Sequence, residues 1–241
     1  MSLSRSIATS LCEPIAPLRR HSAQWPICYE SAIARKLAAQ QQRSPAVVAA
    51  EIAATVTVVE GWQIHTSPSG LLRLQASEPN IAAELQRLLA VPTGCTSELH
   101  VERSRPPDQL FRVQYVHARC WMLLQSAGRE GWFERSLPPP ALPWLTRKGN
   151  LRLQQQAERQ AIGLLFDAVD ALALEQTSDR LWKQAVSLSC QLDAFHAACR
   201  IWSEFKEDLP LAQARLGLTW AGQQLLQVLL NALDLDAPKL L

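Results

Sequence analysis

The C-terminal half of the chain shows helical patterns only, and this feature most constrains the fold. The patterned segments are about 109–127, 151–174, 178–204 and 209–233. Between the first two lies SLPPPALPWLTRKGN, residues 136–150, whose four prolines and one glycine predict a loop because proline interrupts helices. Four helices joined by loops favour a helical bundle. In the last segment the expected buried stripe is Leu211, Leu218, Leu225, Leu226 and Leu229.

Residues 1–90 predict a smaller α+β unit instead. Residues 1–26 are polar and rich in proline, typical of a loose start with one helix to about Leu11. A helical stripe follows from Tyr29 to about Gln42, and Ser44 and Pro45 are typical first residues of a second helix. WQIHTSPSGLLRL predicts two strands about a turn, and a third helix is expected at about 79–89. In the second helix, Val47, Val48, Ile52 and Val56 are expected to face inward.

The fold class that follows is mainly α, with two units. The segment 91–108 contains Pro92, Gly94, Pro106 and Pro107 without a sustained period, so it predicts a linker. The expected domains are therefore 1–90, the linker 91–108, and the helical bundle 109–241.

Composition excludes several classes of protein. With 48% apolar and 19% charged residues the chain is expected to be globular. No apolar run is long enough to span a membrane and the N-terminus has no apolar signal core, so we expect no membrane association and a cytoplasmic location. The six cysteines are never closer than nine residues apart, and the five histidines have no metal-binding spacing. We therefore expect no metal and no cofactor.

The stretch FRVQYVHARC, residues 111–120, carries the first functional hypothesis. Val113, Val116 and Cys120 form an apolar stripe, which leaves Tyr115 and Arg119 together on one face of a helix. A tyrosine beside an arginine can stack on a base and hold a phosphate. Residues 101–160 carry 10 basic against 5 acidic side chains, which agrees with phosphate binding. The alternative is a surface helix with a solvated arginine and a charge surplus of no consequence.

A resemblance extends this hypothesis. The C-terminal RLGLTWAGQQLLQVLLNALDLDAPKLL resembles the end of the class I arginyl-tRNA synthetases, whose DALR anticodon-binding domain closes on R-L-x-L, a leucine-rich tail and a terminal A-P-x-x-M. FRVQYVHARC is similar to the first helix of that domain, V-Q-Y-A-H-A-R, and FHAACRI to its F-Y-x-x-C-R-V helix. The matching positions in the C-terminal stretch are Arg215, Leu216, Leu218, Ala221, Gln224, Leu226, Ala237 and Pro238.

The N-terminal unit resembles the same family. CYESAIARKLA is similar to D-Y-x-S-N-I-A-x-K-L-A, and SPAVVAAEIA to P-x-x-I-A-x-x-I, both from the synthetases' additional N-terminal domain, which touches the tRNA elbow. The matching positions are Tyr29, Ser31, Ile33, Ala34, Lys36, Leu37, Ala38, Pro45, Ala49 and Ile52.

The catalytic signatures of that family are missing from this sequence. None of the five histidines lies in an H-x-G-H motif. TRKGN, residues 146–150, resembles the tail of the K-M-S-x-R loop, but it lacks the Lys-Met and follows the helix that it should precede. We expect an ordinary basic loop there and no catalytic residue in the chain.

The resemblance implies a set of RNA-binding residues. Tyr115 and Arg119 would line the anticodon pocket, with Leu241 packed near it, and His196 stands where the family has a tyrosine. His196 could instead be a histidine packed within the bundle, and Arg200 could simply face solvent. The residues expected to contact RNA are Arg112, Gln114, Tyr115, Arg119, Arg129, Arg147, Lys148, His196, Arg200 and Leu241.

The sequence thus predicts a non-catalytic relative of arginyl-tRNA synthetase that binds tRNA or another structured RNA. Two alternatives remain open. The tryptophan-rich bundle could bind a protein partner, or the chain could supply tRNA binding to a separate catalytic chain. The bundle has six tryptophans, of which at least half are expected in the core: Trp121, Trp132, Trp144, Trp182, Trp202 and Trp220. Exposed tryptophans among them would favour the protein partner.

Overall fold

The structure is a computed structural model, and it describes residues 18–20, 25–56, 62–90, 105–174 and 177–240. The chain is mainly helical and divides into two compact units, Met1–Ile81 and Ala82–Leu241. This division falls inside helix α4 (Glu78–Leu88), whereas the sequence-based assignment placed that helix wholly in the first unit. The helix expected near Leu11 and most of the expected linker lie outside the described residues.

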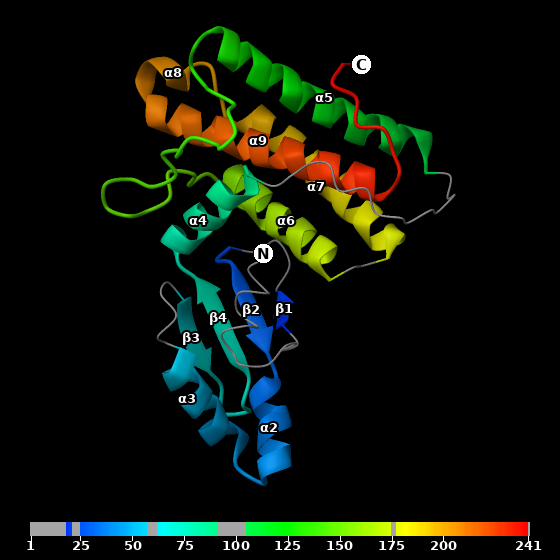
Figure 1. Cartoon of the computed structure of the whole chain (residues 1–241). Helices are drawn as coiled ribbons and strands as arrows, with labels where there is room; N and C mark the ends of the chain where they lie inside the picture. The colour runs from blue at the N-terminus through cyan, green and yellow to red at the C-terminus, as the bar shows by residue number, and fades with distance from the viewer. Residues whose placement is uncertain (1–17, 21–24, 57–61, 91–104, 175–176, 241) are drawn as a thin grey trace. The chain divides into compact units, whose positions relative to one another are not determined.

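The first unit contains a four-stranded antiparallel sheet in the order β1-β2-β4-β3 (Figure 1). Its strands are β1 (Leu18–Arg20), β2 (Cys28–Ser31), β3 (Trp62–Thr66) and β4 (Leu72–Ala76). The predicted pair β3 and β4 is confirmed, but β1 and β2 fall where a loose start and a helix were expected. In β2 only Tyr29 and Ser31 are buried. Two alternate positions are too few to distinguish a strand from a helix by period.

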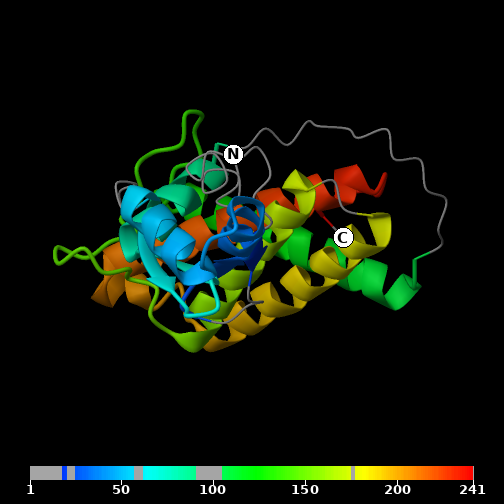
Figure 2. The same ribbon diagram turned by 90° about the horizontal axis from the view of Figure 1, so that it is seen from below.

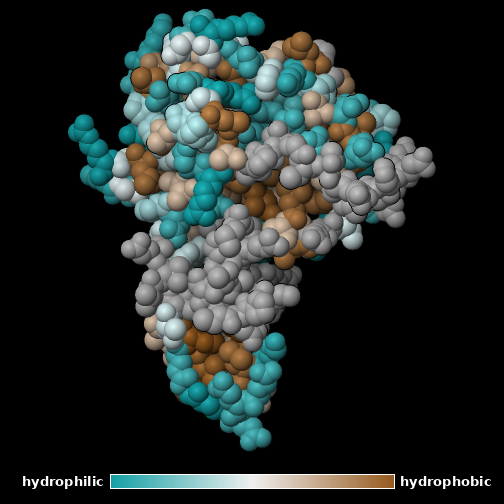
Figure 3. Space-filling view, viewed as in Figure 1, coloured by the Kyte–Doolittle hydropathy of each residue, from teal (hydrophilic) through white to brown (hydrophobic). Residues whose placement is uncertain are grey.

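Two helices accompany the sheet, α2 (Ile33–Gln41) and α3 (Pro45–Val56). The predicted start of α3 at Pro45 is confirmed. Val48 is buried as expected, but Val47 is 48% exposed, so its predicted inward position is wrong. Val48 and Ala49 occupy the buried side of α3, which turns Val47 toward solvent. Figure 3 shows apolar side chains gathered between α2 and α3.

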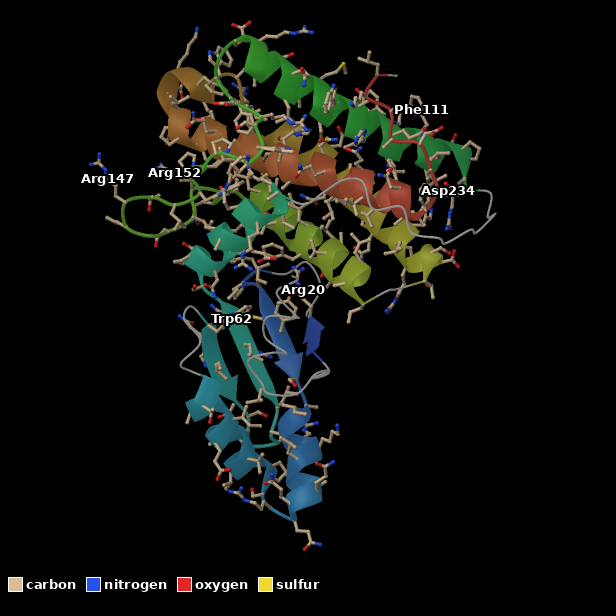
Figure 4. The ribbon with its side chains drawn as sticks, viewed as in Figure 1. Arg20, Trp62, Phe111, Arg147, Arg152 and Asp234 are labelled. Atoms are coloured by element: carbon tan, nitrogen blue, oxygen red, sulfur yellow. The ribbon has the colours of Figure 1, made fainter. Side chains whose placement is uncertain are left out.

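The turn between β3 and β4 requires a glycine at position 70. Gly70 has a φ of +77°, and a Cβ there would lie 2.6 Å from the Cβ of Pro45 at the start of α3. The Ser67 hydroxyl accepts a hydrogen bond from the Leu71 backbone N–H at 2.9 Å. On the sheet itself, Trp62, labelled in Figure 4, lies on β3, and its ring packs edge-on against Tyr29 with ring centroids 6.2 Å apart.

The second unit is the helical bundle. After α4 it contains α5 (Pro107–Arg129), α6 (Gln156–Ala173), α7 (Ser178–Ala198), the short α8 (Glu204–Glu207) and α9 (Leu209–Ala232). Helix α9 contacts each of the other four (Figures 1 and 2). It is therefore buried on nearly every side from Ala212 to Leu226. The predicted leucine stripe was too narrow, because a helix surrounded by others is apolar all round, and Leu211 is only half-buried.

The proline-rich loop after α5 packs on α9 through Trp144. A Cβ on Gly217 of α9 would overlap Cδ1 of Leu142 and lie 2.6 Å from Cη2 of Trp144, so this contact requires glycine. Gln86 of α4 holds the same loop. Its Oε1 accepts from Trp144 Nε1 at 2.9 Å and its Nε2 donates to the Pro140 carbonyl at 2.8 Å.

A buried ion pair ties α9 to α6. The Nε of Arg215 donates to Glu158 Oε1 at 2.7 Å, and both side chains are at most 2% exposed. Arg215 Nη1 also contacts Glu204 at 3.2 Å and the Arg200 carbonyl at 2.7 Å. The arginine of the R-L-x-L motif thus joins three helical segments inside the bundle. In the part of the chain that is described, no helix is both long and apolar enough to cross a membrane.

Candidate nucleic-acid interface

Helix α5 presents an aromatic pair to solvent. Val113, Val116 and Cys120 are buried, as the apolar stripe predicted. This orientation leaves Phe111 60% exposed and Tyr115 43% exposed. Their rings stack with centroids 6.2 Å apart and an interplanar angle of 21°. Phe111 lies one helical turn before Tyr115, and sequence reasoning missed it although the same helical spacing would have found it.

Two arginines lie on the same side of α5, toward α7. Arg112 Nη1 is 3.5 Å from the Cys190 thiol sulfur, and Arg119 Nη1 forms an ion pair with Asp193 Oδ1 at 2.7 Å. The Arg119 and Asp193 side chains are 36% and 55% exposed. Exposed pairs contribute about 0–1 kcal/mol, so a phosphate can compete with Asp193 for this arginine. The structure therefore brings Arg112 together with Tyr115 and Arg119, the two residues expected on one face of this helix.

The opposite side of α5 holds the C-terminal tail. Gln114 Nε2 donates to the Asp236 carbonyl at 3.0 Å. The His117 ring lies 2.8 Å from the Pro238 carbonyl through Nδ1 and 2.7 Å from Gln223 Nε2 through Nε2. A carbonyl can only accept, so Nδ1 carries the proton and Nε2 accepts from the Gln223 amide. Figure 4 shows Phe111 and Asp234 at the end of the bundle where α5 begins.

This arrangement changes the interpretation of the matched motif. Gln114 was expected to contact RNA, but its amide is hydrogen-bonded to the tail, so it positions the tail beside α5. His117 is fully buried, and burial lowers the pKa of its imidazole. Gln114 and His117 of the V-Q-Y-V-H-A-R motif thus both contact backbone carbonyls of the tail, at Asp236 and Pro238. These contacts explain why that motif occurs together with the terminal A-P. Leu241, the last predicted contact, lies outside the described residues.

His196 faces inward. Its Nε2 lies 3.2 Å from the Thr219 hydroxyl, which itself donates to the Arg215 carbonyl, so Nε2–H is the donor to Thr219. Its Nδ1 is buried without a hydrogen-bond partner among the described residues. Burial, reinforced by the charge of Arg119, lowers the pKa of His196 to about 4. These contacts favour the packed alternative over a base-stacking role.

The remaining predicted contacts lie elsewhere on the bundle. Arg147 and Lys148 are exposed at a turn closed by Gly149, whose φ is +81°. Figure 4 shows Arg147 directed away from the bundle, at the other end from Phe111. Arg200 is exposed after the end of α7. The structure does not gather these three with the residues of α5.

A second aromatic group lies at the surface around α8. Trp132 stacks on Phe205 with centroids 4.3 Å apart and lies 5.3 Å from Trp202, which is 39% exposed. Of the six bundle tryptophans, three are buried: Trp144, Trp182 and Trp220. The expectation that half are core is confirmed. Within the described residues no group of His, Cys, Asp or Glu could hold a metal ion.

Comparisons with known proteins assign the helical bundle to a family. Residues 113–241 match the family model of the DALR anticodon binding domain. An arginine–tRNA ligase of Synechococcus sp. (strain JA-3-3Ab) is 34% identical over 131 residues, which are 53% of this chain and 21% of that protein. The Gloeobacter violaceus (strain ATCC 29082 / PCC 7421) enzyme is 33% identical over 151 residues, 60% of this chain and 24% of that protein.

The match to these relatives is partial. An arginine–tRNA ligase of Desulfitobacterium hafniense (strain DSM 10664 / DCB-2) is 26% identical over 147 residues, 59% of this chain and 24% of the relative. The chain thus spans less than a quarter of the length of the relatives it matches. No solved structure matches the chain.

Proposed function

The chain belongs to the DALR anticodon-binding domain family, and from this premise we propose that it binds tRNA or a tRNA-like RNA through the exposed face of α5. The observation that supports the proposal is the stacked, exposed pair Phe111 and Tyr115 with Arg112 and Arg119 beside it. An exposed aromatic surface stacks on unpaired bases, with about 1–3 kcal/mol per base. The adjacent guanidinium groups would hold the phosphates of the same nucleotides.

The contact set in this proposal is narrower than the set predicted from sequence. It consists of Phe111, Arg112, Tyr115 and Arg119, which are close together on one helix. Gln114 acts indirectly by holding the tail, and His196 supports α7 against α9. Arg147, Lys148 and Arg200 would act only as distant phosphate contacts.

We propose further that this chain binds RNA without catalysing aminoacylation. The family match covers the anticodon-binding domain, and the sequence contains no H-x-G-H motif. A role as the tRNA-binding subunit of a separate catalytic chain is compatible with the same contacts. In that role, unlike in the proposed one, a catalytic protein would co-purify with this chain.

A titration of labelled tRNA with the full chain at low salt tests the RNA proposal. We expect the double variant Tyr115→Ala/Arg119→Ala to weaken binding about 10- to 100-fold, since it removes one stacking surface and one phosphate contact. The matched control Arg147→Ala/Lys148→Ala removes two positive charges far from α5 and should weaken binding less. An absence of tRNA binding, or binding unchanged in the α5 variant, would overturn the proposal.

The aromatic group around α8 supports a second candidate function, binding of a protein partner. Trp132, Trp202 and Phe205 form a contiguous and partly exposed surface, and tryptophans are enriched at interface hot spots. Trp202→Ala should abolish a specific protein complex while leaving tRNA binding intact. If Tyr115→Ala abolishes both, the two functions share the α5 face and this candidate is wrong.

A further inference from the structure

A pocket of about 340 Å³ lies in the bundle, away from the α7 side of α5. Its deep wall is formed by Trp220 and Gln224 of α9, which are only 2% and 7% exposed. Gln125 of α5 and Leu137 of the following loop are exposed and line its rim. This volume is at the lower end of the range for ligand sites, about 300–1,000 Å³, and suits one small molecule.

Two cations line this pocket. The Arg135 guanidinium carbon lies 4.5 Å from the ring centroid of Trp121 and 5.4 Å from that of Trp220. Lys239 Nζ of the C-terminal tail also lies 4.5 Å from the Trp121 centroid. Neither cation forms an ion pair with any residue that the structure describes. The pocket is therefore cationic without a compensating carboxylate.

The energetics of Arg135 call for a counter-anion. Burial lowers the pKa of its guanidinium, which shows that the charge is partly removed from water. Arg135 Nη2 donates to the neutral Gln223 Oε1 at 3.3 Å, and the two indole rings attract the guanidinium. None of these partners carries a negative charge, so they offset only part of the cost of taking the charge out of water. An anionic ligand would supply the missing compensation.

Unpartnered polar atoms also line the same walls. Among the described residues, Arg135 Nη1 and the indole Nε1 of Trp220 have no hydrogen-bond acceptor, and Gln224 Oε1 has no donor. Buried polar groups in native proteins are nearly always hydrogen-bonded, so each such group needs an explanation. These three atoms are closed off from solvent, so they add unmet polarity behind the lining, whereas Lys239 and Gln125 are exposed polar groups of the pocket.

The chemistry of the lining selects among anions. A simple inorganic anion would leave most of the volume unused. A free amino acid would bring its ammonium group beside Arg135 and Lys239, with no carboxylate to pair with it. A nucleoside phosphate fits both halves, because its phosphate pairs with the cations and its base edge can pair with the glutamine amides.

We propose that this pocket binds the terminal phosphate of a nucleotide through Arg135 and Lys239, with the nucleoside against Gln224 and the indole of Trp220. The ligand class is a phosphomonoester on a nucleoside, either a free nucleoside monophosphate or the phosphorylated end of an RNA. This proposal stands on the Arg135 pocket alone and does not depend on RNA binding by the α5 face.

Calorimetric titration of the full chain with adenosine 5′-monophosphate tests this proposal. The fold-changes in affinity expected for the probes and variants are those of losing one charged contact. Adenosine without the phosphate and free arginine should each bind at least about tenfold more weakly than the monophosphate. Arg135→Gln should also weaken binding about tenfold or more, whereas the matched control Lys183→Gln, an exposed lysine of α7, should leave it unchanged within about twofold.

A second variant keeps the proposal testable if Arg135→Gln does not fold. Lys239 is exposed in the tail, so Lys239→Gln should fold and still weaken binding about threefold or more. Two short RNAs of one sequence, with and without a 5′-phosphate, distinguish the sources, because only the phosphorylated RNA should bind if RNA ends are the ligand. Tyr115→Ala should leave monophosphate binding intact.

Each outcome decides the proposal. Preferential binding of the monophosphate or of the phosphorylated RNA, weakened in the Lys239 variant, supports it even if the α5 face binds no tRNA. Equal binding of adenosine and its monophosphate, undiminished binding in the Lys239 variant, or no binding of either phosphorylated probe would overturn it.

Discussion

His117 and His196 are both held neutral inside the bundle, by burial and by hydrogen bonds that specify one tautomer each. Burial lowers the pKa of both rings, to about 4 for His196. Because the unfolded chain binds these protons near pH 6.5, the unfolded state takes up more protons as the pH falls below that value. The stability that these rings contribute is complete above about pH 6.5 and is lost progressively toward pH 4.

We predict that the free energy of unfolding falls by about 2 kcal/mol or more between pH 7 and pH 4.5, measured by urea titration at both values. His196→Gln should reduce this loss, because glutamine can still donate to Thr219 but does not titrate in that range. A pH dependence that is unchanged in the variant would show that His196 is not held neutral.

For single residues, the sequence predicted which side chains share a face of one helix. It predicted few contacts between a residue and another part of the chain. The shared face of Tyr115 and Arg119 follows from their spacing on α5. The inward position of His196 depends on Thr219, 23 residues later on α9. Likewise, the role of Gln114 depends on the Asp236 carbonyl, 122 residues away. No local pattern contains either contact.

Among the elements, α9 organises the bundle, and the pair Arg215–Glu158 ties it to α6 at 2.7 Å. We predict that Arg215→Met lowers the free energy of unfolding by about 3–5 kcal/mol, because it leaves the Glu158 carboxylate buried without its cationic partner. Chemical denaturation measures this loss. The double variant Arg215→Met/Glu158→Leu should recover most of it, and a double variant no more stable than Arg215→Met would contradict the account.

The contact of α9 with the proline-rich loop gives another prediction. Gly217→Ala should lower the free energy of unfolding by about 1–3 kcal/mol, because its Cβ would overlap Leu142 and Trp144. Gly128→Ala in α5 is the matched control, since its Cβ would meet only the Phe133 carbonyl at 3.6 Å. Thermal melts of both variants check this, and an equal effect of the two would argue against the close contact.

The sequence predicted long helices better than short strands. The helices α5, α6, α7 and α9 carry enough apolar positions to show a period, and α5 and α9 were predicted within about two residues. The predicted segment 178–204 was too long, because α7 ends at Ala198 and a separate short helix, α8, begins at Glu204. The predicted start of α6 at 151 was five residues early, since α6 begins at Gln156. The strands β1 and β2 have three and four residues, and their pairing, of β1 with β2 and of β2 with β4, is decided across the sheet. The all-round burial of α9 likewise depends on how many neighbours surround it, which periodicity does not encode.

For the whole molecule, the net charge of only +2 limits non-specific attraction to RNA. We therefore predict a shallow salt dependence, set by the few arginines of α5. The logarithm of the tRNA association constant should fall by about 0.7 per phosphate contact for each tenfold rise in salt. Arg112→Ala should reduce this slope by about that amount in anisotropy titrations, and a slope unchanged in this variant would exclude Arg112 as a phosphate contact.

The division into two units was predictable from sequence, because a helical region follows an alternating one. The place of the division inside α4 was not. The residues on both sides of Ile81 continue one helical pattern, and only the contacts of the folded chain separate them.

The α5 face as the RNA-binding surface is tested most directly by photo-cross-linking of 4-thiouridine-substituted tRNA to the full chain, with the linked residues mapped by mass spectrometry. The account predicts cross-links at Phe111 and Tyr115 that disappear with unlabelled tRNA as competitor. Cross-links confined to Trp202 and the residues around α8, with none on α5, would contradict it.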